Sequence, residues 1–399
     1  MKQLLKKEYL YGARNYNPLP ICIKQAKGIY LTDVNDKKYI DFISAYSAVN
    51  QGHCHPRLVE VMKKQCETLT LTSRALYNNI LGDYMEFITK KFNYDKVIPM
   101  NTGVEGGETA IKLARLWGYQ EKKVPENSAV NLFCRNNFWG RTLAACSSST
   151  DPSCFNNFGP FMNGFDMVSY NNLTMLETKL KENPNIVSIM LEPIQGEAGI
   201  ILPDKNYLTG VRNLCDKYKV LMIADEVQTG LGRTGKMLAC DYESVKPDMV
   251  ILGKALSGGM MPISAVLADN QIMNLVQPGT HGSTFGGNPL ASAIAIEAIK
   301  IIEDENLVDN SFRLGKNFRE NIKSMDFNFI KQIRGKGLFN AIEFENIYSA
   351  NEACIKLQEN GLLAKLTQEN TLRLAPPLVI TDEQLNQSCE IIKKSLDSI

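Results

Sequence analysis

Residues 220–228 read VLMIADEVQ, and residues 249–259 read MVILGKALSGG. Each stretch begins with a short apolar run and then reaches a charged residue, Asp225 in the first and Lys254 in the second. Val187–Leu191 is a third apolar run of this kind. Short runs that are apolar on both faces are typical of strands buried in a parallel sheet. These stretches therefore predict an α/β fold with a mostly parallel sheet.

Helical patterns separate these runs, as an α/β fold requires. Apolar residues recur at helical spacing over 105–119 and 207–218. Residues 28–42 alternate like a small antiparallel hairpin that turns at Asn35-Asp36. From about Ser311 onward the pattern becomes helix, strands, helix, strand and helix, which predicts a smaller α+β domain.

The composition excludes several classes of protein. The chain has 399 residues, with 44 Lys+Arg and 43 Asp+Glu, so it carries no basic footprint for nucleic acid or an anionic membrane. No apolar run approaches the roughly 18–20 residues that span a bilayer. Residues 1–20 lack the apolar core of a secretory signal, so we expect a cytoplasmic protein, or a mitochondrial matrix protein if a presequence was removed.

Cysteines and histidines give no sign of a disulfide framework or a metal centre. The ten cysteines are scattered with no C-x-x-C pair, which favours reduced thiols. Cys146 and Cys154 flank a Ser/Thr-rich loop and could form a regulatory disulfide. His53 and His55 flank Cys54, but further ligands with structural spacing are lacking. We expect no metal site and local hydrogen bonds for these rings.

Asp225 and Lys254 are the first candidates for a reactive site. Ligands of open α/β sheets bind beyond the carboxyl ends of the strands, where both residues would lie. An aspartate there can hold a cationic ligand atom, such as a protonated ring nitrogen. A lysine at the edge of an apolar core has a depressed pKa and can form a Schiff base. The alternatives are a solvated strand end for Asp225 and a snorkelling surface lysine for Lys254.

Two glycine-containing segments are candidates for phosphate binding. Residues 100–110, MNTGVEGGETA, open an amphipathic helix, and the free N–H groups at such an end suit a phosphate. The alternative is a simple capped helix start, with Thr102 as the cap. Residues 279–287, GTHGSTFGG, could supply a second phosphate contact or form a surface loop.

A third glycine segment suggests a different class of protein. Residues 230–235, GLGRTG, match the G-x-G-x-x-G pattern of dinucleotide-binding oxidoreductases. That pattern should open a helix directly after a strand, whereas here residues 225–228 intervene and no persuasive helix start follows. We therefore do not expect nicotinamide-dinucleotide binding.

Over nearly its whole length the sequence resembles the pyridoxal 5′-phosphate (PLP) dependent aminotransferases of fold type I, class III. The segments that carry the resemblance are SAYSAVNQGHCHP, MNTGVEGGETAIKLARLWGY, NNFWGRTL, LEPIQGEAG, ADEVQTGLGRTGK, LGKALSGG and HGSTFGGNP. Within this family they are most similar to the ornithine aminotransferases. The resemblance implies a large domain with a seven-stranded-type sheet, flanked by helices, and a small α+β domain. We expect an N-terminal segment over 1–46 that packs with the small domain, a PLP-binding domain over 47–305 and a small domain over 306–399.

The resemblance assigns roles around the cofactor ring. Lys254 matches the Schiff-base lysine, which also carries a proton between substrate and cofactor. Asp225 matches the carboxylate that keeps the pyridine nitrogen protonated, so that the ring accepts electrons. Gln228 matches the residue that hydrogen-bonds the ring hydroxyl. Phe138 and Val227 match the residues on the two faces of the ring.

The resemblance also assigns the phosphate contacts. Thr102, Gly103 and Val104 match a cradle at a helix start. Ser283 and Thr284 match a segment that reaches the phosphate of a neighbouring subunit. This last match implies composite sites and a homodimer as the smallest working unit, with higher oligomers left open.

Five residues match the substrate contacts of the ornithine aminotransferases. Arg141 matches the arginine that grips a carboxylate far from the reacting carbon, beside Tyr16 and Tyr46, which read the α-groups of ornithine. Arg373 matches the arginine that binds the carboxylate next to the reacting carbon of glutamate or 2-oxoglutarate. Glu197 matches the acid that masks this arginine when ornithine is bound, since an unpaired buried charge is costly.

These matches predict an ornithine δ-aminotransferase that makes L-glutamate 5-semialdehyde and L-glutamate from L-ornithine and 2-oxoglutarate. The alternative within the family is an acetylornithine or GABA-type ω-aminotransferase, and Tyr16 is the residue that most favours the ornithine reading. A catalytically silent binding protein on the same scaffold is a third reading. The presence of Lys254, Asp225 and Arg141 together argues against it.

Overall fold

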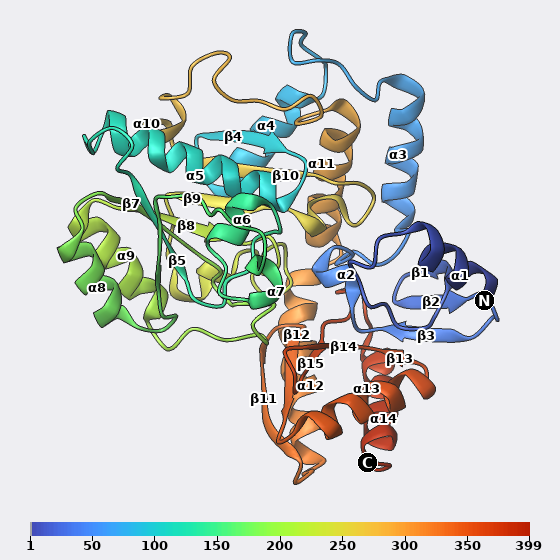
Figure 1. Ribbon diagram of the computed structural model, residues 1–399. Helices are drawn as coiled ribbons and strands as arrows, with labels where there is room; N and C mark the ends of the chain where they lie inside the picture. The colour runs from blue at the N-terminus through green and yellow to red at the C-terminus, as the bar shows by residue number, and fades with distance from the viewer. Residues whose placement is uncertain (1) are drawn as a thin grey trace.

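The computed structural model describes residues 2–399 and contains a central seven-stranded sheet (Figure 1). In spatial order its strands are β4 (Lys96–Met100), β10 (Ser264–Ala268), β9 (Met249–Leu252), β8 (Leu221–Asp225), β7 (Ile186–Leu191), β5 (Val130–Cys134) and β6 (Phe165–Val168). Neighbours from β9 to β6 run parallel, and β10 is antiparallel to both β9 and β4. The predicted α/β fold class with a mostly parallel sheet is confirmed.

Helices cover both faces of this sheet. Along β8, Leu221 and Ile223 pack in one apolar cluster with α5 (Gly103–Gln120), whereas Met222 and Ala224 pack in another with α8 (Leu173–Glu182) and α9 (Tyr207–Tyr218). Successive side chains of a strand point to opposite faces, so α5 lies on one face and α8 and α9 on the other. Both faces of β8 are therefore buried, as its uninterrupted apolar run predicts.

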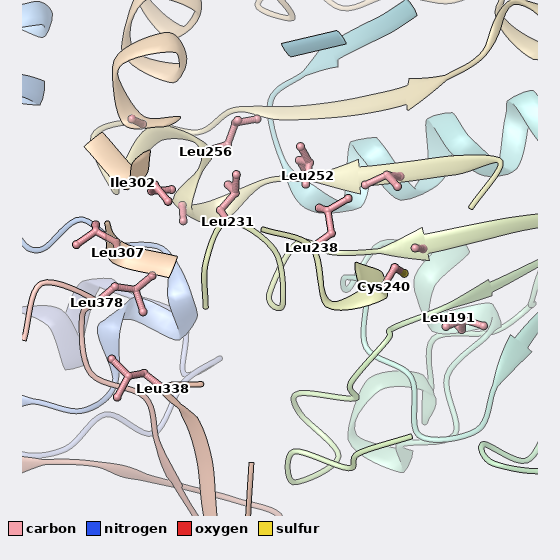
Figure 2. Packing of buried hydrophobic residues seen from close by; sticks show 14 of the residues in the cluster. Leu191, Leu231, Leu238, Cys240, Leu252, Leu256, Ile302, Leu307, Leu338 and Leu378 are labelled. Atoms are coloured by element: carbon pink, nitrogen blue, oxygen red, sulfur yellow. The ribbon is translucent and has the colours of Figure 1, made fainter. Parts of the chain in front are cut away.

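The C-terminal part is built on a smaller, antiparallel sheet. Its strands follow the order β11 (Ile330–Lys336), β12 (Phe339–Phe344), β15 (Thr371–Leu374) and β14 (Lys365–Thr367). The helices of this part are α12 (Leu307–Ser324), α13 (Ile347–Glu359) and α14 (Asp382–Leu396). Figure 2 shows that the apolar core continues from Leu252 of the large sheet to Leu338 and Leu378 of this part. The two parts thus share one core.

The N-terminal strands pair with the C-terminal part rather than with the large sheet. β1 (Ile23–Lys27), β2 (Tyr30–Asp33) and β3 (Lys38–Asp41) form antiparallel pairs, and β13 (Leu362–Leu363) joins β3 in parallel. The turn between β2 and β3 has Asp36 at φ 66°, in the left-handed region that Asn and Asp tolerate. This pairing agrees with a division at residues 46 and 305, which stays a prediction.

The remaining helices complete the chain. They are α1 (Lys2–Tyr11), α2 (Ser44–Ser47), α3 (Pro56–Thr68), α4 (Leu81–Phe92), α6 (Leu143–Ser147), α7 (Pro152–Phe155), α10 (Asn270–Met273), α11 (Pro289–Asp304) and the 3₁₀ helices η1 (Ala239–Glu243) and η2 (Lys254–Ser257). Between residues 2 and 399, none of the helices combines the length and the apolar character that crossing a membrane demands.

Several further sequence expectations can be compared with the structure. The glycines of 230–235 lie in turns that lead to η1, so they do not open an α-helix against a phosphate. His53 Nε2 lies 2.7 Å from Asp41 Oδ2, in agreement with the expected local hydrogen bond, whereas His55 Nε2 lies 3.0 Å from Glu305 Oε1, so the expectation of a local bond is wrong for His55. The ten cysteines are free thiols, and Cys146 and Cys154 are both buried. Across residues 2–399 the structure contains no group of His, Cys, Asp and Glu side chains suited to a metal ion.

Candidate active site

Asp225 and Lys254 reach the same pocket from neighbouring strands. β8 ends at Asp225, β9 ends two residues before Lys254, and the two strands are parallel partners with Asp225 opposite Ile251. The pocket beyond these strand ends is lined by both residues and by Gly103, Val104, Phe138, Trp139, Gly140, Glu192, Val227 and Gln228. The spacing in the sequence therefore places two opposite charges at the carboxyl ends of neighbouring strands.

Burial moves both charged groups of this pocket toward neutrality. It raises the pKa of Asp225 to about 6, although the N–H of Val227 donates to Asp225 Oδ1 at 3.0 Å and opposes that rise. Burial, together with the positive charge of Arg373, lowers the pKa of Lys254 to about 8. An amine with such a pKa is an effective proton carrier near pH 7.

The backbone of Lys254 has an uncommon conformation. Its φ of 46° lies in the left-handed region, which costs free energy for a residue with a Cβ. The preceding strand and the following turn of η2, which is capped by Gly258 at φ 58°, hold it there. Strain of this kind concentrates at functional sites because the surrounding structure must maintain it.

The start of α5 presents backbone N–H groups to the same pocket. Thr102 caps the helix, since its Oγ1 accepts from the N–H of Glu105 and the Glu105 carboxylate accepts from the N–H of Thr102. The cap leaves the N–H groups of Gly103 and Val104 without a hydrogen-bond acceptor among residues 2–399. Gly103 and Val104 line the pocket, so these donors and the helix dipole suit a phosphate.

Phe138 and Val227 both line this pocket, and the glycines near it are tightly packed. A Cβ on Gly103 would lie 3.1 Å from Val227 Cγ1, and a Cβ on Gly140 would lie 2.4 Å from Val104 Cγ2. Gly140 also has φ 149°, so a side chain at this position is excluded on both counts. The backbone at these two glycines therefore approaches Val227 and Val104 more closely than a side chain would allow.

These features fit PLP. The Asp225 carboxylate could balance a protonated ring nitrogen, the α5 N-terminus suits the phosphate, and Lys254 supplies an amine to the same pocket. Phe138 and Val227 are the candidates for the two ring faces. Each of these side chains was singled out from the sequence, and the structure brings them all to one pocket.

The five residues predicted to contact substrates line an adjoining pocket. Tyr16, Tyr46, Arg141, Glu197 and Arg373 surround it, and it shares Phe138, Gln228 and Lys254 with the first pocket. They come from five separate parts of the chain, namely the N-terminal segment, α2, the loop after β5, the loop after β7, and β15. A substrate in this pocket would reach Lys254 while its carboxylates meet arginines.

Arg373, Glu197 and Gln228 form a closed polar triangle. Arg373 is 4% exposed, and its Nη1 donates to Glu197 Oε1 at 3.0 Å and to Gln228 Oε1 at 2.9 Å. Gln228 Nε2 donates to the same Glu197 oxygen at 3.0 Å. Burial lowers the pKa of Arg373, while the charge of Glu197 raises it. The acid thus neutralises an arginine that would otherwise be a lone buried charge.

The remaining substrate candidates differ in exposure. Tyr46 belongs to four consecutive residues, 44–47, with positive φ, an energetically costly left-handed turn that directs its ring toward Arg373, whose Cζ lies 5.3 Å from the ring centroid. Tyr16 is 76% exposed. Arg141 is exposed and its guanidinium lies 5.8 Å from the Phe138 ring centroid. A carboxylate could therefore reach Arg141 from solvent.

Of the residues predicted to bind the cofactor, Thr102 caps α5 without lining the pocket, and Ser283 and Thr284 also lie outside it. Ser283 Oγ accepts from Asn101 Nδ2 at 2.8 Å, and Thr284 is exposed. This placement agrees with a role toward a second subunit, which stays a prediction.

Several residues that line the two pockets were not predicted as ligands from the sequence, among them Trp139, Glu192 and Lys365. Trp139 and Glu192 belong to the motifs NNFWGRTL and LEPIQGEAG, in which the predicted ligands are Phe138 and Glu197. Lys365 lines the substrate pocket because β14 pairs with β15 and sets it opposite Arg373 on one face of the sheet. No local sequence signal marks Lys365, since its position depends on that pairing.

Comparisons with known proteins agree with this geometry. Residues 11–396 match the family model described as aminotransferase class-III. The chain belongs to this family. It is 54% identical over 393 residues to the mitochondrial ornithine aminotransferase of Drosophila melanogaster, covering 98% of this chain and 91% of that protein.

Solved structures of similar aminotransferases have the same fold as this chain. The ornithine aminotransferase of Toxoplasma gondii superposes with a TM-score of 0.98 at 45% identity, covering 100% of this chain and 95% of that one. A second structure of the Toxoplasma protein has PLP at partial occupancy in its active site. The acetylornithine aminotransferase of Elizabethkingia anophelis has a TM-score of 0.92 at 46% identity and covers 100% and 99% of the two chains.

Proposed function

We infer that this protein is a PLP-dependent ornithine aminotransferase, which transfers the δ-amino group of L-ornithine to 2-oxoglutarate and yields L-glutamate 5-semialdehyde and L-glutamate. Similarity along 98% of the chain to a relative of that name supports the reaction. The observation that carries the substrate pair is the masked arginine, Arg373 with Glu197, beside Lys254.

When bound, PLP supplies an aldehyde for the migrating amino group and a ring that accepts electrons from the reacting carbon. We propose that Lys254 Nζ takes the proton from that carbon and returns it, which its lowered pKa favours. Asp225 holds a negative charge in the pocket and keeps the ring nitrogen protonated. Phe138 and Val227 would contact the ring, and the N–H groups of Gly103 and Val104 would hold the phosphate.

The substrate pocket must accept two different charge patterns. The carboxylate of ornithine is remote from its δ-amine, so we propose that Arg141 binds it with a planar fork while Tyr16 and Tyr46 contact the α-groups. 2-Oxoglutarate has a second carboxylate beside the reacting carbon, and Arg373 is the donor for it. Glu197 then has to leave Arg373, and it pairs with Arg373 again when ornithine enters.

The test is a donor scan with purified protein, PLP and 2-oxoglutarate, in which o-aminobenzaldehyde traps the cyclised semialdehyde. Ornithine should give a strong signal, and N-acetylornithine and GABA should give little glutamate. Efficient transfer from N-acetylornithine would leave the family assignment intact but replace the substrate. N-acetylornithine is included in the scan because the acetylornithine aminotransferase of Elizabethkingia anophelis is 46% identical to this chain.

We propose a homodimer with composite active sites as the working unit. Phe285, next to Ser283 and Thr284, is 56% exposed, so this apolar ring is available to a second copy. The experiment mixes Lys254→Ala chains with Thr284→Ala chains. Hybrid dimers should regain activity if Thr284 serves the partner's site, and a monomeric mass in solution with full activity would contradict the dimer.

We propose the cytoplasm as the location of this chain. The Drosophila relative is named mitochondrial, so the matrix is the competing location. Fractionation of cells that express the native gene distinguishes the two, since the enzyme should follow cytosolic rather than matrix markers.

A further inference from the structure

The acid Glu197 is carried by a tight loop that projects from the large sheet toward the small domain. Gln195 and Ile201 exchange backbone hydrogen bonds of 3.1 and 3.0 Å, which close residues 195–201 into a narrow loop after β7. Within it Gly199 has φ 105° and the β-branched Ile200 has φ 57°. Such values are costly for a β-branched residue, so other contacts must hold this loop in shape.

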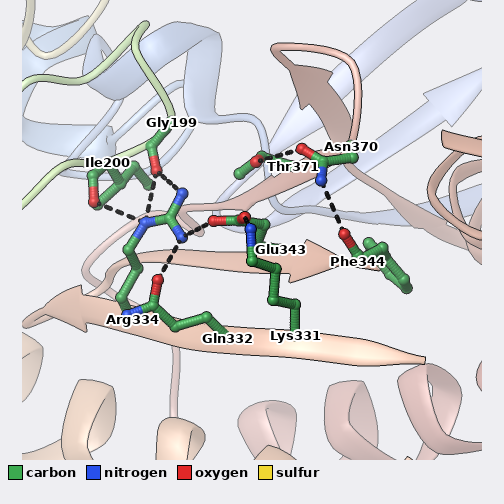
Figure 3. Close-up of polar contacts among 9 residues, drawn as sticks. All are labelled: Gly199, Ile200, Lys331, Gln332, Arg334, Glu343, Phe344, Asn370 and Thr371. Carbon is green, nitrogen blue, oxygen red and sulfur yellow. Dashed lines mark hydrogen bonds and ion pairs between the residues drawn. The ribbon is translucent and has the colours of Figure 1, made fainter. Parts of the chain in front are cut away.

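Those contacts come from the small domain. The Glu197 carbonyl accepts from Thr367 Oγ1 at 2.5 Å and from Gln368 Nε2 at 2.9 Å. Arg334 of β11 donates from Nε to the carbonyls of Gly199 and Ile200, at 3.0 and 3.2 Å, and from Nη2 to Gly199 at 2.7 Å (Figure 3). Three side chains of the small domain, Arg334, Thr367 and Gln368, thus hold the backbone that carries Glu197.

Arg334 is itself fixed by its surroundings. It is 9% exposed, and its Nη1 donates to Gln332 Oε1 at 2.9 Å and to the Glu343 carboxylate (Figure 3). Lys331 holds the other oxygen of Glu343 at 2.6 Å. The side chain of Ile200 packs with Phe339 and Ala341 of β12, on the sheet that carries Arg334. These contacts hold the guanidinium in an orientation in which its Nε and Nη2 groups face the loop carbonyls.

We propose that Arg334 is a positioning residue for substrate choice, because its hydrogen bonds to the Gly199 and Ile200 carbonyls hold Glu197 where it can mask Arg373. Arg373 belongs to β15, which pairs with β12 in the same sheet as Arg334. One sheet of the small domain therefore positions both Arg373 and the loop whose Glu197 neutralises it. This inference rests on the proposed function, since masking matters only to an enzyme with two substrate classes.

The test compares the two half-reactions of Arg334→Gln with those of the unaltered holoenzyme by stopped-flow absorbance of the cofactor. L-Ornithine drives one half-reaction, and L-glutamate drives the other on the same form of the enzyme. The ornithine rate constant should fall about tenfold or more, as misplacement of a positioned group by a remote change allows, while that for glutamate stays within about threefold. Equal losses in both, or no loss in either, would overturn the inference.

Two further variants separate this effect from a folding defect. Thr367→Val keeps the side-chain shape but removes the donor to the Glu197 carbonyl, so it should lower the ornithine rate selectively and to a smaller extent. Arg313→Gln is the matched control, because Arg313 is an exposed small-domain arginine that pairs with Asp382. It should alter neither half-reaction. If Thr367→Val acts equally on both substrates, the loop does not select between them.

The same data distinguish failure of this inference from failure of the proposed function. If the unaltered enzyme does not react with ornithine, the proposed function is wrong whatever the variants do. If it reacts with ornithine and Arg334→Gln leaves the ratio of the two rate constants unchanged, only the role of Arg334 is wrong.

Discussion

The cofactor side and the substrate side of the active site are built in different ways. Asp225 and Lys254 lie at the carboxyl ends of adjacent strands of one sheet, and apolar side chains pack on both faces of these strands. Glu197, Arg373 and Tyr16 instead come from a loop, a second sheet and the N-terminal segment, and they meet only because these parts pack together. The residues assigned to the chemistry common to the family are thus positioned by one sheet. The residues assigned to substrate choice depend on how several segments pack together.

The comparison predicts its largest effect at Lys254. Lys254→Ala removes the proton carrier from the pocket, so both half-reactions should slow by about 10³-fold or more. Single-turnover absorbance with ornithine and with glutamate measures this loss. Lys246→Ala is the control, because this lysine is exposed and pairs with Asp269. Retention of either half-reaction by Lys254→Ala would refute the assignment.

Asp225→Asn should give the next largest effect. The amide keeps the shape of the carboxylate but cannot balance a protonated ring nitrogen. Loss of one partner from a buried charge pair costs roughly 3–5 kcal/mol, so both half-reactions should fall about 10²- to 10³-fold and by the same factor. The same stopped-flow measurement decides this. A loss confined to one substrate would show that the cofactor side also selects substrates.

The sequence predicted the cofactor side more completely than the substrate side. Apolar runs that end in Asp225 and Lys254 reveal the strands and their polar ends, because burial on both faces leaves a local pattern. The capping role of Thr102 is likewise local and was foreseen as one of two readings. These features need no knowledge of distant contacts.

The substrate side could not be worked out from local patterns. Arg373 and Lys365 become neighbours only through the pairing of β14 with β15, and the hold of Arg334 on Gly199 joins residues that are 135 positions apart. Arg141, Tyr16 and Glu197 were named through resemblance to a family rather than through any pattern of their own. The left-handed turn around Tyr46 left no signal at all, since no glycine marks it.

Tyr16→Phe tests the substrate side with a smaller change. Removal of one hydroxyl deletes about one hydrogen bond, so the ornithine half-reaction should slow roughly 3- to 10-fold while the glutamate half-reaction is unchanged. Tyr11→Phe is the matched control, since Tyr11 is 88% exposed and lies in the same segment. An equal effect of Tyr16→Phe on both substrates would mean that Tyr16 only packs against the site.

The smallest effect concerns the pH dependence of stability on the cofactor side. Glu192 is buried beside Asp225 and accepts from the N–H groups of Phe138 and Gly196, both at 3.0 Å. Burial, with the charge of Asp225, raises its pKa from 4.5 to about 8. The folded chain therefore holds more protons than the unfolded chain between these pH values, and the stability that this carboxyl contributes falls as pH rises through that range.

Glu192→Gln should remove this part of the pH dependence. Between pH 5 and pH 8, the Tm of the cofactor-free wild-type protein should fall by a few degrees more than that of Glu192→Gln, since about 1 kcal/mol moves Tm by roughly 2–4 °C in a large domain. Differential scanning fluorimetry at both pH values measures the two slopes. The substitution also disturbs the two backbone bonds, but that offset is common to both pH values, so parallel slopes would contradict the prediction.

The central claim is that chemistry and substrate choice are separable, and the ratio of the ornithine to the glutamate rate constant tests it most directly. Glu197→Ala should lower this ratio about tenfold or more, because Arg373 is left as an unpaired buried charge when ornithine binds. Asp225→Asn should leave the ratio within about threefold, since it weakens both half-reactions alike. An unchanged ratio in Glu197→Ala, or a strongly altered ratio in Asp225→Asn, would contradict the account.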